Sequence, residues 1–161
     1  MTELREPVSG AAVRLVRRGL LALTLITICA TAFELATVHH WNNLEQLIPW
    51  VALSVLAVAT ILSLLQDRWA RITVRMLALI VVGASVYGVI DHILVNYDSG
   101  PLDQRFAETW DSTPVIERWW YAITKTVGPS PTLAPGVLGM GAVLLLLASL
   151  IDTRPIEKQS G

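Results

Sequence analysis

The sequence has 161 residues, of which 53% are hydrophobic and only 16% charged. An average soluble domain carries roughly 25% charged residues, so this composition is typical of an integral membrane protein. The 12 Lys and Arg residues are nearly balanced by 13 Asp and Glu residues, and no basic aromatic surface is evident, so we expect no nucleic-acid partner. Glycine-rich phosphate loops, CxxC pairs and HExxH or GxSxG motifs are missing from the sequence, which makes a conventional soluble-type active site unexpected.

Four apolar stretches each approach the roughly 20 residues that a helix needs to cross a bilayer core of about 30 Å. They comprise residues 19–38, 47–65, 72–95 and 132–151. No internal repeat or low-complexity tract interrupts them. The sequence therefore predicts an all-α polytopic membrane protein, a four-transmembrane-helix bundle that forms a single domain over residues 1–161. The single cysteine, Cys29, lies within an apolar stretch, and we expect it to be a buried packing residue.

The distribution of Lys and Arg predicts the orientation of the chain in the membrane. Placing the N-terminus in the cytoplasm leaves only Arg105, Arg118 and Lys125 on the outer side, and this bias is typical of cytoplasmic loops. We therefore expect a multi-pass protein of the bacterial cytoplasmic (inner) membrane with both termini in the cytoplasm. In this orientation Trp69 lies at the inner interface. An aromatic belt at the outer interface would comprise Trp41, Trp50, Trp110, Trp119 and Trp120.

The segment 96–130 is too long for a simple connection between two helices. Ser112, Thr113 and Pro114 supply the start signals of a helix and Gly128 supplies a stop, which predicts a loop helix over about residues 114–126. Val115, Trp119 and Ile123 recur on this helix at helical spacing. We expect an amphipathic helix that lies along the outer membrane face or caps the bundle.

Two groups of polar residues within the apolar stretches are candidates for function, since ionisable groups inside a membrane are costly. In the first stretch Thr24, Thr27, Thr31 and Glu34 fall within one stripe of a helix, which predicts a polar face directed into the bundle. In the third stretch the four-residue spacing of Ala84, Gly88 and His92, with Asn96 nearby, predicts a small-residue groove leading to an imidazole. Asp91 is adjacent in sequence but about 100° away on a regular helix.

Both groups lie near the outer end of their helices, where His39 and His40 follow Glu34. Three hypotheses remain open for this cluster. Glu34 and His92 can form a purely structural pair across the bundle; alternatively, Glu34 can titrate as protons or substrate pass. In the third hypothesis the cluster binds a divalent transition metal, with Glu34, His40, Asp91 and His92 as ligands.

Several segments resemble a pattern found in a family of uncharacterised small four-helix bacterial inner-membrane proteins. The similar segments are Glu34 to Trp41, Gln46 to Trp50, Gly88 to His92 with Asn96, and Leu133 to Gly136. The resemblance spans about 100 residues and implies no activity, substrate or cofactor.

The function expected from the sequence is that of a small integral accessory or binding protein whose outer-side Glu/His cluster is structural or binds metal. The alternatives are a small proton-coupled transporter that uses Glu34, or a membrane metalloenzyme. We assign no catalytic or cofactor-binding residues and expect a protein that is not an enzyme. The expected partners are the lipid bilayer and a larger membrane complex or further copies of the chain.

Overall fold

The computed structural model describes residues 10–65 and 67–151, and among these residues every regular element is helical. Four helices pack side by side, and the first two are α1 (Gly10–Thr37) and α2 (Leu44–Leu62). The other two are α3 (Arg68–Asp98) and α5 (Ala134–Leu150). Between α3 and α5 lie two short 3-10 helices, η1 (Gly100–Leu102) and η2 (Trp110–Ser112), and the helix α4 (Val115–Ile123).

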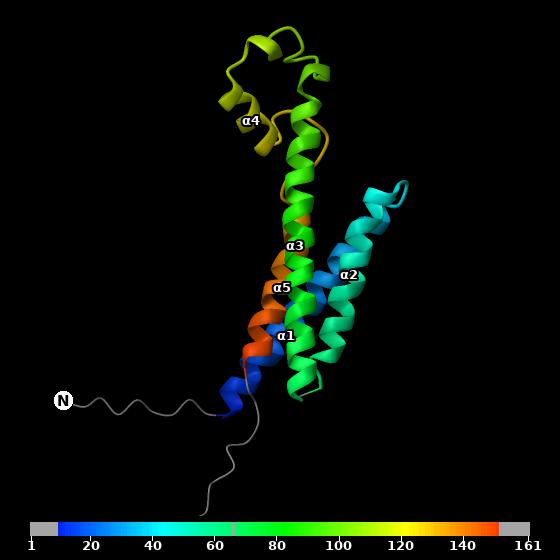
Figure 1. Cartoon of the computed structure of the whole chain (residues 1–161), viewed down its shortest axis with the longest axis vertical. Coiled ribbons are helices and arrows are strands. Elements are labelled where there is room, and N and C mark those ends of the chain that lie inside the picture. The colour runs from blue at the N-terminus through cyan, green and yellow to red at the C-terminus, as the bar shows by residue number, and fades with distance from the viewer. Residues whose placement is uncertain (1–9, 66, 152–161) are drawn as a thin grey trace, which may run out of the picture.

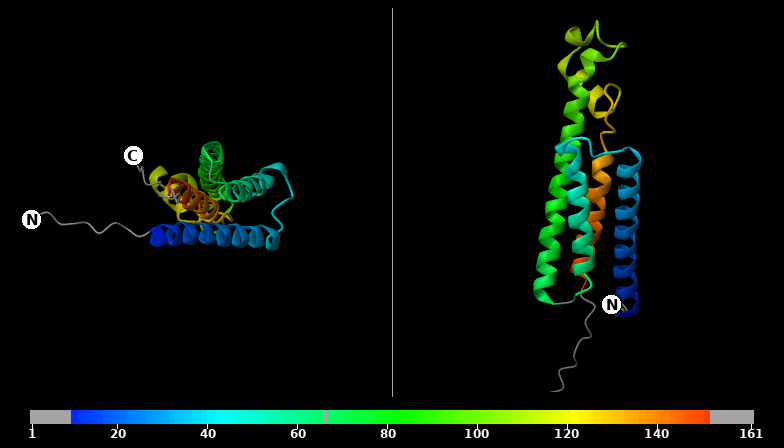
Figure 2. Two further views of the ribbon diagram at one scale, coloured as in Figure 1. Left: turned by 90° about the horizontal axis from the view of Figure 1, so that it is seen from below. Right: turned by 90° about the vertical axis from the view of Figure 1, so that its right-hand side faces the viewer.

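By length and composition, α1, α2 and α3 can each cross a membrane. The fourth apolar helix, α5, has 17 residues, which at 1.5 Å per residue corresponds to about 26 Å. In Figure 1 and in the view from below in Figure 2, α3 and α5 lie side by side. Helix α1 runs obliquely to them. The all-helical fold class is thus confirmed, together with three membrane-compatible helices.

Helices α1, α2 and α3 begin earlier than the apolar stretches predict. The residues 10–18 that precede the first stretch extend α1, because neither Gly10 nor the arginines that follow it break a helix. Two polar residues set the other starts: the side chain of Asn43 accepts a hydrogen bond from Gln46 N (2.8 Å), and that of Asp67 accepts one from Ala70 N (2.9 Å). Both are N-caps, which satisfy backbone donors that the helix leaves unpaired.

Glycine permits close packing of α5 against its neighbours. A Cβ added at Gly139 would lie 2.9 Å from the Cβ of Ser85 on α3, and one added at Gly141 would lie 2.9 Å from Thr27 Cγ2 on α1. Gly88 on α3 likewise faces Pro135. Without a hydrophobic driving force in lipid, such close backbone approach is a main source of helix association, so α5 is the central packing element of the bundle. Cys29, predicted to be buried, is exposed instead, since the small residues of α1 that face α5 are its threonines.

Two arginines cap the helices that end at the same end of the bundle as the N-terminus of α1. Arg17 donates from Nη2 to the carbonyl of Ser63, the residue that follows α2. Arg75 donates from Nε to Ser149 Oγ (3.2 Å) and from Nη2 to Ser149 O (3.0 Å), in the last turn of α5. The last carbonyls of a helix carry partial negative charge, so both contacts are favourable. Arg75 therefore stabilises the end of α5.

Helix α3 extends beyond the other helices of the bundle at the opposite end. The last turns of α3, both 3-10 helices, α4 and the connection to α5 form a compact extension there (Figures 1 and 2). We call residues 96–133 the distal module. Asn96, Tyr97 and Arg105 hold this module in place.

Candidate functional site

The predicted polar face of α1 is only partly buried in the bundle. Thr24 and Thr31 are buried, and Thr24 Oγ1 donates to Leu20 O (2.9 Å) while lying 3.4 Å from Gly141 O of α5. Glu34, in contrast, is exposed. It lies at the edge of the stripe, about 60° from Thr31, and one turn before the end of α1. The prediction that the whole face looks into the bundle is therefore wrong for its carboxylate.

The histidines His40 and His92 lie near enough to each other for the charge of His92 to affect His40. His92 on α3 lies with Nδ1 2.9 Å from the carbonyl of Pro131, so in the neutral ring this nitrogen carries the proton. His40 follows α1, and its carbonyl accepts a hydrogen bond from Trp50 Nε1 (2.7 Å). Partial burial lowers the pKa of His40, and the charge of His92 lowers it further. The His92 ring therefore joins α3 to the segment before α5, and the His40 carbonyl joins the α1–α2 connection to α2.

The local backbone explains how His40 reaches this position. Helix α1 ends in a motif in which His40 N donates to Leu35 O (3.0 Å) and His39 N to Ala36 O (3.2 Å). This pattern is a Schellman motif, which requires a left-handed residue, and His39 has a φ of 53°. The chain thereby reverses within two residues and directs His40 back towards the bundle.

The metal hypothesis finds little support in this arrangement. Within residues 10–65 and 67–151, no group of three or more His, Cys, Asp and Glu side chains is placed so that it could hold a metal ion. Of the four predicted ligands, His40 and His92 interact, whereas Glu34 is exposed on α1 and Asp91 leaves α3 in a different direction from His92. The four side chains therefore do not form one coordination site in this conformation.

Asn96 is the centre of the distal module and is fully buried. Its Nδ2 group lies 2.8 Å from Ser130 O, 3.2 Å from Ala122 O and 3.3 Å from Thr132 Oγ1. Its Oδ1 accepts a hydrogen bond from Ser130 N (2.9 Å). One side chain thus joins the end of α3 to the last turn of α4 and to the connection that leads into α5.

The backbone at Gly128 passes close to Asn96 and contributes to the same contact between α3 and the distal module. Gly128 has a φ of +82°, and a Cβ at this position would lie 2.4 Å from Asn96 Cα. Only glycine adopts this conformation readily and leaves room for the helix. Gly128, read from the sequence as a helix stop, is thus also the point at which the chain passes against α3.

Tyr97, near the end of α3, packs against two tryptophans of the distal module. The ring of Tyr97 stacks on Trp119 of α4 with 4.4 Å between centroids, and it contacts the edge of Trp110 at 5.6 Å. Trp110 is only 3% exposed and packs directly over Gly100. Placing Trp110 in an interfacial belt was therefore wrong, because its ring is part of the core of the module. Trp41 and Trp120 are exposed.

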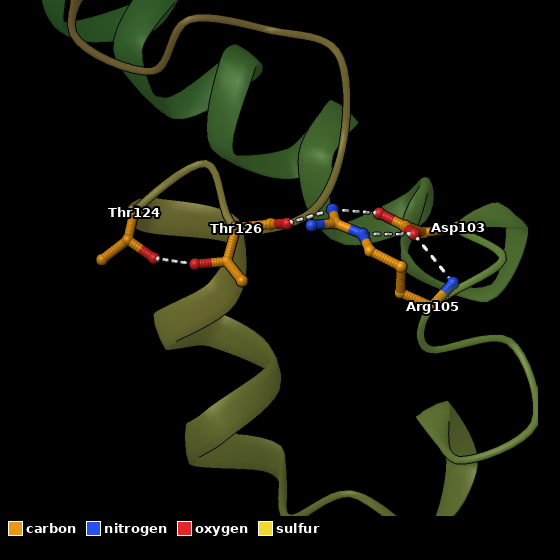
Figure 3. A network of polar contacts seen from close by, with 4 residues as sticks. All are labelled: Asp103, Arg105, Thr124 and Thr126. Carbon is orange, nitrogen blue, oxygen red and sulfur yellow. Dashed lines mark hydrogen bonds and ion pairs between the residues drawn. The ribbon is translucent and has the colours of Figure 1, made fainter.

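An ion pair between Arg105 and Asp103 lies where the loop after α3 meets the end of α4 (Figure 3). Arg105 donates from Nε to Asp103 Oδ1 (3.0 Å) and from Nη2 to Asp103 Oδ2 (2.7 Å) and to Thr126 O (2.7 Å). The guanidinium lowers the pKa of the Asp103 carboxyl, chiefly through these hydrogen bonds. The contact to Thr126 O ties the end of α4 to the loop that follows α3.

One face of α4 has no partner among the described residues. Ile116, Trp120 and Ile123 recur every three or four residues and are 77%, 63% and 45% exposed. The adjacent face packs on α3 through Trp119 and the buried Ala122. The sequence grouped Val115, Trp119 and Ile123 on one face of a helix over about residues 114–126. In the structure α4 is shorter, and Trp119 packs on Tyr97 of α3 while Ile123 is exposed, because tertiary contacts decide which face is covered.

The chain matches no protein-family model, and comparison with curated proteins and with solved structures gives no significant match.

Proposed function

We propose that the chain is a small accessory protein of the bacterial inner membrane that binds a partner protein through the exposed face of α4. In this proposal α5 spans the membrane together with α1, α2 and α3, and both termini lie in the cytoplasm. The charge distribution supports the orientation, because six arginines of the described residues gather at the end of the bundle where α1 and α3 begin.

The height of α4 above the membrane favours a protein partner. The interaction of His40 with His92 marks the level at which α1 ends, and Asn96 follows His92 by one turn, about 5.4 Å further out. The headgroup layer adds about 5–7 Å to each side of the hydrocarbon core. Ala122, at the end of α4, is bound at the level of Asn96. By this estimate the last turn of α4, with Ile123, lies in the outer part of the headgroup layer, and the helix leads away from the membrane towards its first residue, Val115.

An exposed apolar face of this kind on a rigid support is typical of a protein interaction site. The distal module carries five acidic and three basic residues in its sequence from Asp98 to Lys125. Two copies of the module would repel each other, whereas a partner with an apolar groove and a basic rim would be attracted. A heterologous partner is thus favoured over self-association. The single observation on which the proposal depends is the solvent-exposed row Ile116, Trp120 and Ile123.

The test is photo-crosslinking in the native membrane. A photoreactive amino acid at Ile116 or Trp120 is expected to give one discrete adduct, whose mass spectrum identifies a different membrane or envelope protein. The matched control position is Glu117, which is exposed on the same helix but lies about 100° around it from Ile116. If the only adducts have twice the mass of the chain, the chain binds a second copy of itself and the proposal of a different partner protein is refuted. If Glu117 gives as much adduct as Ile116 or Trp120, binding is not specific to the apolar face of α4.

We propose a structural role for His40 and His92, because the His40 carbonyl binds Trp50 of α2 and the His92 ring binds the segment before α5, close to the base of the distal module. Proton-coupled transport remains the second candidate, and the buried hydroxyls of Thr31 and Ser85 favour it, since neither has a partner among the described residues. That hypothesis predicts loss of flux in Glu34→Gln with folding unchanged. The exposure of Glu34 makes it the weaker of the two.

A further inference from the structure

The basic end of the bundle contains arginines with two different roles. Of the six described there, Arg17 and Arg75 are bound to the carboxyl ends of α2 and α5. Arg14, Arg18 and Arg68 are exposed, and no hydrogen bond or ion pair joins them to another described residue. Two of the six arginines therefore stabilise the fold through helix ends, while three are directed to the surroundings.

The surrounding charges at this end favour an anionic ligand. The amino ends of α1 and α3 both point to it and add positive partial charge. The negative ends of α2 and α5 are neutralised by Arg17 and Arg75. Asp67 is the acidic residue described at this end, and its carboxylate is directed to Ala70 N as a helix cap.

The position of the basic end of the bundle in the bilayer indicates which anionic ligand it meets. Trp69 is adjacent to Arg68 at the start of α3 and is 74% exposed. An exposed tryptophan at the end of a membrane-spanning helix prefers the headgroup layer. Arg68 therefore lies at the level of lipid phosphates, and Arg14 and Arg18 occupy the same end of the molecule on one face of α1, four residues apart.

From this arrangement we propose that Arg14, Arg18 and Arg68 form a binding surface for the headgroups of anionic phospholipids. Guanidinium groups bind phosphate oxygens through paired hydrogen bonds, and each basic residue near an anionic surface strengthens binding by about fivefold. Because the three arginines lie on two helices, the surface binds several lipid molecules around the bundle. This inference is independent of the partner proposed for α4, which lies at the opposite end.

Thermal unfolding in a neutral detergent, followed by tryptophan fluorescence, provides the test. Added phosphatidylglycerol is expected to raise the unfolding midpoint, whereas equal amounts of phosphatidylcholine leave it unchanged. In the triple variant Arg14→Gln/Arg18→Gln/Arg68→Gln, the phosphatidylglycerol concentration needed for half of the effect should rise on the order of a hundredfold. The midpoint without lipid should stay close to that of the parent.

Two controls separate lipid binding from folding and from other anions. Arg17→Gln should lower the midpoint without lipid but retain the response to phosphatidylglycerol, since Arg17 caps α2. Lys125→Gln, at the opposite end, should alter neither. An equal response to phosphatidylcholine, an unchanged response in the triple variant, or a full response to inorganic phosphate at matched ionic strength would each overturn the proposal.

Discussion

Replacing Asn96 with alanine should release the distal module from the bundle while leaving the membrane helices folded. The substitution removes the hydrogen bonds to Ser130 O (2.8 Å) and Ala122 O (3.2 Å) and the one accepted from Ser130 N (2.9 Å). Each is worth about 1 kcal/mol net, and the buried groups left without a partner add about 1 kcal/mol. We therefore expect the local stability of the module to fall by about 3–4 kcal/mol.

Hydrogen–deuterium exchange measured by mass spectrometry is the appropriate assay, because it reports the stability of each segment separately. A loss of 3 kcal/mol predicts that backbone amides near residues 122–132 exchange on the order of a hundred times faster. Amides in the cores of α2 and α3 should not change. The matched control is Asn42→Ala, which removes one exposed hydrogen bond to His39 O (3.2 Å). Exchange in Asn96→Ala that stays within threefold of the parent would refute the argument that this side chain fixes the module.

Three further predictions test local features of the fold by thermal unfolding in detergent. Lys125 has a φ of 56° at the end of α4, so Lys125→Gly should raise stability by about 1 kcal/mol while Lys125→Ala should not. Gly139→Leu should cost about 1–3 kcal/mol, because its Cβ meets Ser85, whereas Gly83→Leu, with open space around it, should be tolerated. His40 has a lowered pKa, so the folded state binds fewer protons, and stability should fall as pH drops below about 6.5 and level off once the lowered pKa is passed. His40→Gln should flatten that dependence; a profile identical to the parent would contradict it.

The sequence predicted the apolar helices well because their signal is local. Runs such as residues 47–65 and 72–95 overlap α2 and α3 closely, and the differences lie at the ends, where Asn43 and Asp67 begin the helices earlier. Helix ends depend on single capping hydrogen bonds, which hydropathy does not detect. Arg75 shows the same limit, because its contact with Ser149 joins residues 74 positions apart.

The candidate site was predicted less well for a related reason. The sequence placed Glu34, His40, Asp91 and His92 at one level, and of these residues His40 and His92 lie near enough for the charge of one to affect the other. Helical periodicity gives the direction of a side chain relative to its own helix, but the exposed position of Glu34 depends on how α1 crosses its neighbours. The contacts of Asn96 are made to residues 26 to 36 positions away, and no periodic pattern encodes them.

The attachment of α4 should also determine how strongly the proposed partner binds. A helix of 9 residues is not stable alone in water, so α4 depends on the module for its conformation. Asn96, Tyr97 and Arg105 hold it before any partner arrives, so binding carries no cost for ordering the helix. Asn96→Ala should therefore weaken crosslinking from Ile116 although Asn96 is buried and cannot touch the partner, because apparent affinity falls with the fraction of ordered α4. Undiminished crosslinking in a variant whose α4 exchanges rapidly would show that the partner recognises an extended segment and would refute a preformed helical face.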